Sequence, residues 1–186
     1  MKTPLCEAIV LSILAVACGG SPPPAAAHPP VTANNADLPA STKAETKSDP
    51  TFAPCHNTFK PASNDKDVAG DVDAMAKGCA DTTKMKKAGD TLAGEVRESA
   101  PPVLFAFGAQ AGKCYRIYGI SQSTMQDFDV SWVDSAGALV AQDTTDDVSP
   151  VIAEDGKICF KTSDATAIRA TAGAGAGKFA LQVWSD

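Results

Sequence analysis

The segment Thr171–Phe179, which reads TAGAGAGKF, combines a glycine run with a lysine, a composition that can surround a phosphate. A phosphate-binding loop follows the pattern G-x-x-x-x-G-K-[ST] and joins a strand to a helix. Here Ala172 stands where the first glycine belongs, and Phe179 replaces the hydroxyl residue that would hold magnesium. An alternating, strand-like pattern follows. We therefore expect a β-turn between the last two strands and no nucleotide site.

Catalysis by a serine or cysteine nucleophile needs a histidine and a carboxylate beside it. In the part of the chain that we expect to fold, His56 is the only histidine, it is adjacent to Cys55, and no G-x-S-x-G motif occurs. A single histidine without C-x-x-C also argues against a zinc or redox centre. We predict that the protein is not an enzyme. A hydrolase with two catalytic carboxylates stays open as the weaker alternative, since no two acidic residues are singled out.

Acidic residues gather around one predicted strand and in the following segment QDTTDD. Calcium is bound by six to eight oxygen atoms, often from such loops. The candidate calcium ligands are Asp127, Asp129, Asp143, Asp146 and Asp147. Because short acidic residues also favour turns and keep hairpin ends unpaired, we prefer the interpretation without a metal and expect no cofactor.

Aromatic side chains are the candidates for stacking on sugar rings. Trp132 shares its strand phase with Phe128 and Val130, which places it in the core. Trp184 shares its phase with Gln182, so we expect an exposed indole that marks a ligand or partner surface. A carbohydrate-binding or calcium-binding module is thus an alternative function.

The N-terminus has the features of an export signal. One positive charge at Lys2 precedes the apolar stretch 8–17, which is shorter than the about 20 residues that span a bilayer. The small residues that end at Ala17 and precede Cys18 resemble a bacterial lipobox. The resemblance implies cleavage after residue 17, acylation of Cys18 and, since Gly19 is not aspartate, an outer-membrane location. Ordinary secretion with cleavage near Ala17 is the alternative.

Four cysteines remain after Cys6 and Cys18 are set aside, namely Cys55, Cys79, Cys114 and Cys159. In an exported chain they predict two disulfides, for which three pairings exist. Strand alternation places Cys114 and Cys159 on the more polar phase of their strands, which favours a cross-strand bridge on the outer face of a sheet. Cys55 and Cys79 would then bracket a helix.

The spacing between those two cysteines predicts a helix with Asn64 as its N-cap and Gly78 at its C-terminal end. One face would carry the apolar residues Val68, Val72, Met75 and Cys79. The helix would lie within a disulfide-bracketed segment that covers residues 55–90.

After Cys79 the pattern changes to short alternating runs separated by Gly, Asp, Ser or Pro. The runs are 91–97, 103–109, 113–121, 127–133, 138–142, 149–153, 157–162, 166–171 and 178–184. About eight such strands predict a mainly β domain over 91–186, an antiparallel β-sandwich.

Residues 18–54 are rich in proline, alanine and polar residues, with no aromatic residue before Phe52, which predicts a disordered tether. The net charge is −6, and the three arginines, Arg97, Arg116 and Arg169, are scattered. Nucleic acid is therefore excluded as a partner.

The order of strands and turns over residues 103–184 resembles the bacterial pre-peptidase C-terminal domain. The resemblance is carried by the aromatic strand at Phe105–Phe107, Gly112-Lys113, the pair Asp127 and Asp129, the hairpin 134–141 and the glycine-rich segment 173–184. The added cysteines look like a variant seen in myxobacterial lipoproteins. The resemblance implies a jelly-roll-like sandwich without a catalytic set, usually found beside secreted proteases or other exoenzymes.

These observations predict a lipid-anchored module of the cell envelope that binds a protein or glycan partner and does not catalyse a reaction. An accessory domain of a secreted hydrolase system is the alternative.

Overall fold

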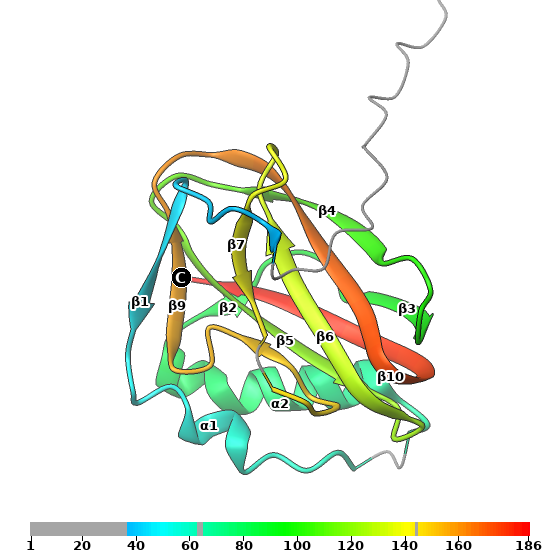
Figure 1. Ribbon diagram of the computed structural model, residues 1–186. Coiled ribbons are helices and arrows are strands. Elements are labelled where there is room, and N and C mark those ends of the chain that lie inside the picture. Colours follow the sequence, from blue (N-terminus) through cyan, green and yellow to red (C-terminus); the bar gives the residue numbers. More distant parts are fainter. Residues whose placement is uncertain (1–36, 63–64, 144) are drawn as a thin grey trace, which may run out of the picture. The chain divides into compact units, whose positions relative to one another are not determined.

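The computed structural model describes residues 37–62, 65–143 and 145–186. The signal segment, Cys18 and Asn64 lie outside the described residues. The described chain forms two helices and ten strands (Figure 1). In chain order these are β1 Ala44–Ser48, α1 Pro54–Asn57, α2 Val68–Thr83, β2 Lys86–Lys87, β3 Leu92–Arg97, β4 Val103–Ala109, β5 Cys114–Ser121, β6 Met125–Val133, β7 Leu139–Gln142, β8 Val151–Ile152, β9 Gly156–Phe160 and β10 Asp164–Ser185.

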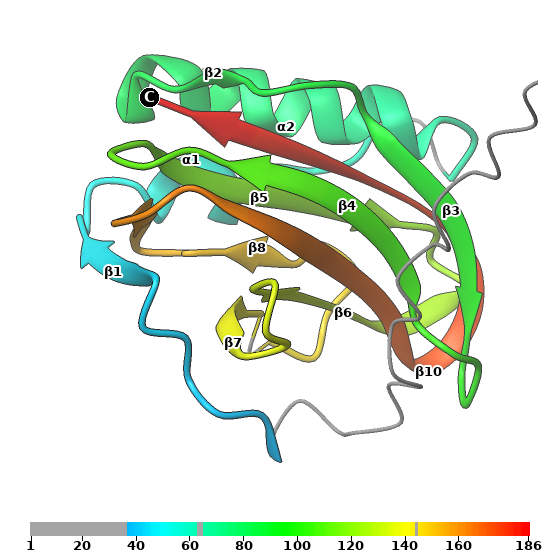
Figure 2. The ribbon, with the colours of Figure 1, turned by 90° about the horizontal axis from the view of Figure 1, so that it is seen from above.

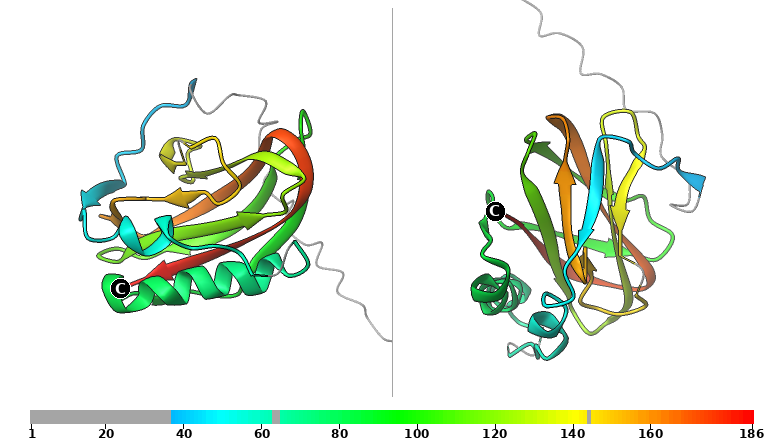
Figure 3. Two further views of the ribbon diagram at one scale, coloured as in Figure 1. Left: turned by 90° about the horizontal axis from the view of Figure 1, so that it is seen from below. Right: turned by 90° about the vertical axis from the view of Figure 1, so that its left-hand side faces the viewer.

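The long strand β10 belongs to both layers of an antiparallel sandwich (Figures 1 and 3). Its N-terminal half pairs with β4 and β6, and β7 continues this first layer beyond β6. Its C-terminal half pairs with β3, β5 and β2, and the second layer extends from β5 through β9 to β1. The predicted mainly β sandwich is thereby confirmed.

The glycine run lies inside β10, so the predicted turn between two strands is wrong. Register shifts between Ala172 and Gly175 mark bulges where β10 leaves β6. Gly175 has φ +86°, and a Cβ there would lie 2.6 Å from the carbonyl oxygen of Thr124. Bulges and glycine let a strand bend sharply, so the run carries β10 from one layer into the other without a break in pairing.

The main core lies between the two layers and is rich in aromatic rings. Trp132, as predicted, is fully buried and makes edge contacts with Phe107 and Tyr115. Its Nε1 donates a hydrogen bond to Thr166 Oγ1 at 2.7 Å. The indole therefore buries a large apolar surface without leaving its polar atom unpaired.

Helix α2 covers the outer face of the second layer and forms a second core there (Figure 2). Val72, Met75 and Cys79 are buried on the predicted face. The boundaries differ from prediction, because Asp67 is the N-cap and accepts a hydrogen bond from Gly70 N at 2.9 Å. The helix also continues through Gly78 to Thr83, since one glycine costs only about 1 kcal/mol within an otherwise favourable helix.

The predicted tether ends earlier than residue 54. Residues 44–48 form β1, which pairs with β9, and Phe52 is buried. Lys43 Nζ lies 2.8 Å from the carboxylate of Asp164, and Ser41 Oγ donates to Asp134 Oδ2 at 2.7 Å. Polar contacts that the composition of 18–54 does not reveal thus attach this segment to the sandwich.

Both predicted disulfides are present, Cys55–Cys79 and Cys114–Cys159. Cys114 lies opposite Cys159 in the β5–β9 register. The bridge lies on the outer face of the second layer, as expected, but this face is not exposed, because helix α2 and its neighbours bury both cysteines in the second core. Two disulfides favour an extracytoplasmic domain. No described helix is long and apolar enough to cross a membrane.

Candidate ligand site around His56

Arg116 occupies the middle of β5 with its side chain on the face that carries Cys114 and Tyr118. Alternation along a strand predicts this phase. The guanidinium is completely buried, because the segment that contains Phe52 and α1 covers it. A charged group is thus enclosed beneath the N-terminal helical segment.

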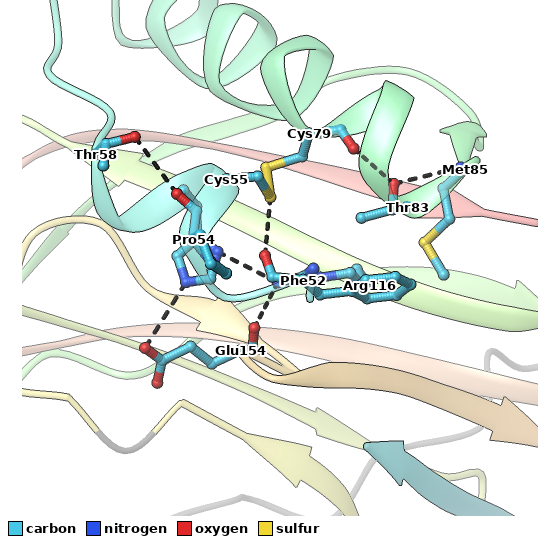
Figure 4. Close-up of a disulfide and its surroundings, with 10 residues drawn as sticks. Phe52, Pro54, Cys55, Thr58, Cys79, Thr83, Met85, Arg116 and Glu154 are labelled. Carbon is cyan, nitrogen blue, oxygen red and sulfur yellow. Dashed lines mark hydrogen bonds and ion pairs between the residues drawn. A yellow bond between two sulfur atoms is a disulfide. The ribbon is translucent and has the colours of Figure 1, made fainter. Parts of the chain in front are cut away.

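Aromatic rings replace a carboxylate as the main neighbours of this charge. The Arg116 guanidinium carbon lies 5.2 Å from the centroids of both Phe52 and Tyr118, which are cation–π distances. Figure 4 shows Arg116 beside Phe52. Nη2 donates to the carbonyl oxygen of Glu154 at 2.9 Å. Nε and Nη1 have no hydrogen-bond acceptor among the described residues. Burial lowers the pKa of Arg116 from its usual value.

His56 lies directly beside Arg116 and is held there by α1. The adjacent Cys55 is bonded to Cys79 of α2, which fixes the short helix against the long one (Figure 4). The imidazole side chain is only 7% exposed. Its Nδ1 lies 3.4 Å from Arg116 Nη2. A guanidinium can only donate, so this contact is a hydrogen bond only in the ring tautomer that leaves Nδ1 without a proton.

The Nε2 atom of His56 is buried and has no hydrogen-bond partner among the described residues. The carboxylate Oε1 of Glu154 is 3.8 Å away, and this side chain is 48% exposed. Burial, and then the charge of Arg116, lower the pKa of His56 below its ordinary value. The ring is therefore neutral at pH 7.

Two adjoining hollows meet at this ring, and we call them together the His56 hollow. Both are lined by His56, Asn57, Asp147 and Ser149. The larger has a volume of about 260 Å³ and adds Phe59 and Met75. The smaller, about 40 Å³, adds Asp143, Thr145, Val151 and Glu154. The hollow thus lies where α1, α2 and the segment from β7 to β9 come together.

The lining combines hydrogen-bond acceptors with a small apolar wall. Asp143 accepts from Thr145 Oγ1 at 3.1 Å, and Asp147 Oδ1 accepts from the backbone N of Ser149 at 2.7 Å. These contacts hold the carboxylates of Asp143 and Asp147 in place. Phe59 and Met75 supply the apolar side. The arrangement suits a polar ligand with one apolar face.

No protein-family model matches this sequence, and no curated protein matches it. Among solved structures, the pre-peptidase C-terminal domain of a collagenase from Bacillus anthracis is similar over 50% of this chain and 87% of that chain. The TM-score is 0.39 and the sequence identity 10%. With so few identical residues, this likeness says nothing about the ligand of either protein.

The predicted calcium ligands divide between two places. Asp143 and Asp147 line the His56 hollow. Asp127 and Asp129, on β6, lie beside Gly173, where a Cβ would be 1.9 Å from Asp127 Oδ2 and 3.1 Å from Asp129 Oδ2. Burial and then neighbouring carboxylates, Asp146 among them, raise the pKa of both Asp127 and Asp129. In the described chain, no three of the five acidic residues bring their oxygens within 4.8 Å of one another.

The sulfurs of Cys55 and Cys79 and a ring nitrogen of His56 do lie within 4.8 Å of one another. These two cysteines could bind zinc only as free thiolates, since the thiolate is the form that binds a metal. Here the two sulfurs are bonded to each other. With the disulfide formed, these residues hold the helix and do not form a metal centre.

Trp184 does not form the exposed binding surface that its strand phase predicted. The indole is 5% exposed, contacts Tyr118 edge-on, and donates from Nε1 to Gln182 Oε1 at 2.9 Å. Gln182 in turn donates to Asp73 of α2 at 3.1 Å. Helix α2 covers this face, so the polar phase of β10 is buried and hydrogen-bonded.

Sequence reasoning singled out His56 and two of the acidic residues in the hollow but missed Arg116 and Glu154. Arg116 reads as one more polar residue on the outer face of a strand. The available signal was Phe52, an isolated aromatic residue three positions before Cys55 in an otherwise non-aromatic stretch. Such a residue next to a disulfide indicates a segment that packs on the sheet.

Proposed function

We propose that this chain is a binding module of the bacterial cell envelope, anchored through a lipid on Cys18, that engages a protein or glycan partner at the His56 hollow and has no catalytic role. The observation that carries the proposal is the pair of adjoining hollows whose linings share His56, Asn57, Asp147 and Ser149. Concave sites with a few polar groups and an apolar wall are the usual form of a ligand site.

Binding is favoured over catalysis because of what surrounds the ring. In a Ser-His-Asp arrangement a carboxylate accepts from Nδ1–H and makes the imidazole a stronger base. Here a guanidinium lies beside Nδ1 and lowers the pKa of His56. Ser149 lines the same hollow, but its neighbouring histidine is arranged to stay neutral rather than to accept a proton.

The binding site is tested with two tryptophan variants of the full-length protein. Asn57→Trp places a large side chain in the hollow from an exposed position, and Lys60→Trp adds the same side chain at an exposed position outside the lining. We expect the wild type and Lys60→Trp to bind the same soluble envelope fragments, either glycan or peptide, and Asn57→Trp to lose that binding. Equal binding by both variants, or no binding by the wild type, would refute the proposal.

The anchor is tested separately by the intact mass of the protein taken from membranes. The proposal predicts a mature chain that begins at Cys18 and carries acyl groups, and a Cys18→Ser variant that is released from the membrane fraction. An unacylated mature chain would contradict the anchor and leave the binding site untouched.

A further inference from the structure

The larger of the two hollows beside His56 has an apolar side and an acidic side. Phe59 and Met75 form the apolar wall, and Asp147 and Ser149 supply oxygen atoms to the same lining. The volume of about 260 Å³ is below the about 300–1,000 Å³ of a pocket for a drug-sized ligand. An occupant of this hollow is therefore small, such as one long side chain of a partner.

The carboxylates beside this hollow have no counter-ion within the described chain. Asp147 is exposed, and its Oδ1 accepts a hydrogen bond from the backbone N of Ser149 at 2.7 Å, which orients the group. Among the described residues, no lysine or arginine forms an ion pair with Asp127, Asp129, Asp146 or Asp147. Burial, and then the charges of Asp146 and Asp147, raise the pKa of Asp127. The folded chain thus leaves negative charge next to the hollow uncompensated.

The positive groups nearby do not reverse this charge. Arg116 is completely buried and lines neither hollow, and the charges of Asp155 and Glu154 oppose the lowering of its pKa by burial. Lys60 follows Phe59 in the chain but is exposed and lies outside the lining. His56 is neutral at pH 7, as argued above. No positive charge therefore lines the larger hollow.

A side chain with an apolar stem and a cationic end matches this lining. Lysine and arginine bury their methylene stems along apolar surface and keep the charged end at a polar group. Phe59 and Met75 can cover the stem while Asp147 accepts hydrogen bonds from the charged end. A carboxylate or phosphate group would be repelled by Asp147, and a neutral side chain would leave the negative charge uncompensated.

We propose that the larger hollow receives a lysine or arginine side chain from a peptide segment of the envelope partner, with the stem against Phe59 and the charge at Asp147. This inference rests on the proposed function and names the partner as a protein rather than a glycan. The net charge of −6 would also speed the encounter with a basic segment, because complementary charges steer association.

The test titrates the full-length protein with synthetic nonapeptides of glycine and serine whose central residue is arginine, lysine, citrulline or glutamate. Citrulline keeps the shape of arginine without its charge. Binding is followed by NMR through the methyl signal of Met75, which lines the hollow. We expect the arginine and lysine peptides to bind the wild type about fivefold or more tightly than the citrulline peptide, which corresponds to about 1 kcal/mol for an ion pair. About 1 M salt should remove most of this difference.

Two pairs of variants assign the binding to the hollow. Asn57→Trp should lose the basic peptides, and Lys60→Trp should bind them at least as well as the wild type. Asp147→Asn should remove the preference for arginine over citrulline, although its amide oxygen can still accept from Ser149. Asp90→Asn, which removes an exposed carboxylate between β2 and β3, should keep that preference.

A citrulline peptide that binds as tightly as the arginine and lysine peptides would overturn the assigned charge selectivity. So would a preference for arginine that survives in Asp147→Asn. If envelope glycans require an open hollow and none of the peptides bind, the basic-peptide inference is wrong and the proposed function stands. If no ligand distinguishes Asn57→Trp from Lys60→Trp, both proposals fail.

Discussion

The Nδ1 atom of His56 lies 3.4 Å from Nη2 of Arg116, so a titratable ring shares a buried site with a permanent positive charge. Glu154 is the acidic residue that faces both, through its carbonyl to Arg116 and its carboxylate toward His56. The charge of Arg116 disfavours protonation of the ring. The stability and the pH response of this site therefore depend on the same contact.

Acid should destabilise the protein through His56. Its folded-state pKa is lowered, so between that value and the unfolded value of about 6.5 the unfolded chain binds more protons. The contribution of His56 to the free energy of unfolding is thus fully present above about pH 6.5 and is lost as pH falls through the folded-state pKa. Denaturant melts across this range should show the loss in the wild type and not in His56→Gln. If the free energy of unfolding falls equally in the wild type and in His56→Gln, the loss comes from other titratable groups.

The neutral state of His56 should depend on Arg116. Arg116→Met removes the neighbouring charge and keeps much of the buried volume, so we expect the His56 pKa to rise toward, but stay below, its ordinary value because burial remains. Stability should change by no more than about 1–2 kcal/mol, since buried charges are often replaced by apolar groups at little cost. Arg116→Ala should cost about 2–4 kcal/mol through the cavity that it leaves. NMR titration of His56 and urea melts provide the two readouts. An unchanged pKa in Arg116→Met would show that the guanidinium does not act on the ring.

The two disulfides should differ in function more than in stability. Their sequence separations are 24 for Cys55–Cys79 and 45 for Cys114–Cys159, so loss of either should cost about 3–4 kcal/mol by the chain-entropy argument. Cys55→Ala with Cys79→Ala also frees α1, and we expect it to abolish ligand binding at His56. Cys114→Ala with Cys159→Ala serves as the control, measured at a temperature where both variants are folded. Ligand binding that survives loss of Cys55–Cys79 would mean that α1 is held by other contacts.

The Asp127–Asp129 pair should be unfavourable at neutral pH. The pKa values of both residues are raised, so their ionisation above about pH 4 weakens the fold. Asp127→Asn should stabilise the protein by up to about 1 kcal/mol at pH 7 and by nothing near pH 3, while Asp90→Asn, an exposed carboxylate between β2 and β3, should do neither. If the predicted calcium site exists, about 1 mM calcium will raise the wild-type Tm and not that of Asp127→Asn. Destabilisation by Asp127→Asn at pH 7 would contradict the repulsion.

Alternation and cysteine spacing predicted most of the strands and both disulfides, because the core phase of Trp132 and the positions of Cys114 and Cys159 follow from a period of two. The same period places Trp184 and Arg116 on an outer face but does not show that this face is buried. An outer face looks polar in sequence whether water or a helix covers it, and only the packing of α2 and of Phe52 decides. In the sequence, the bend at Gly173 and Gly175 looks like a turn. Local composition does not show that a strand can continue through such a bend while its pairing partners change.

The account is tested most directly by ¹⁵N NMR of the His56 imidazole in the full-length protein as a function of pH. We predict a ring that is neutral at pH 7, because burial and then the charge of Arg116 lower its pKa. A ring that is doubly protonated at pH 7 would contradict the account.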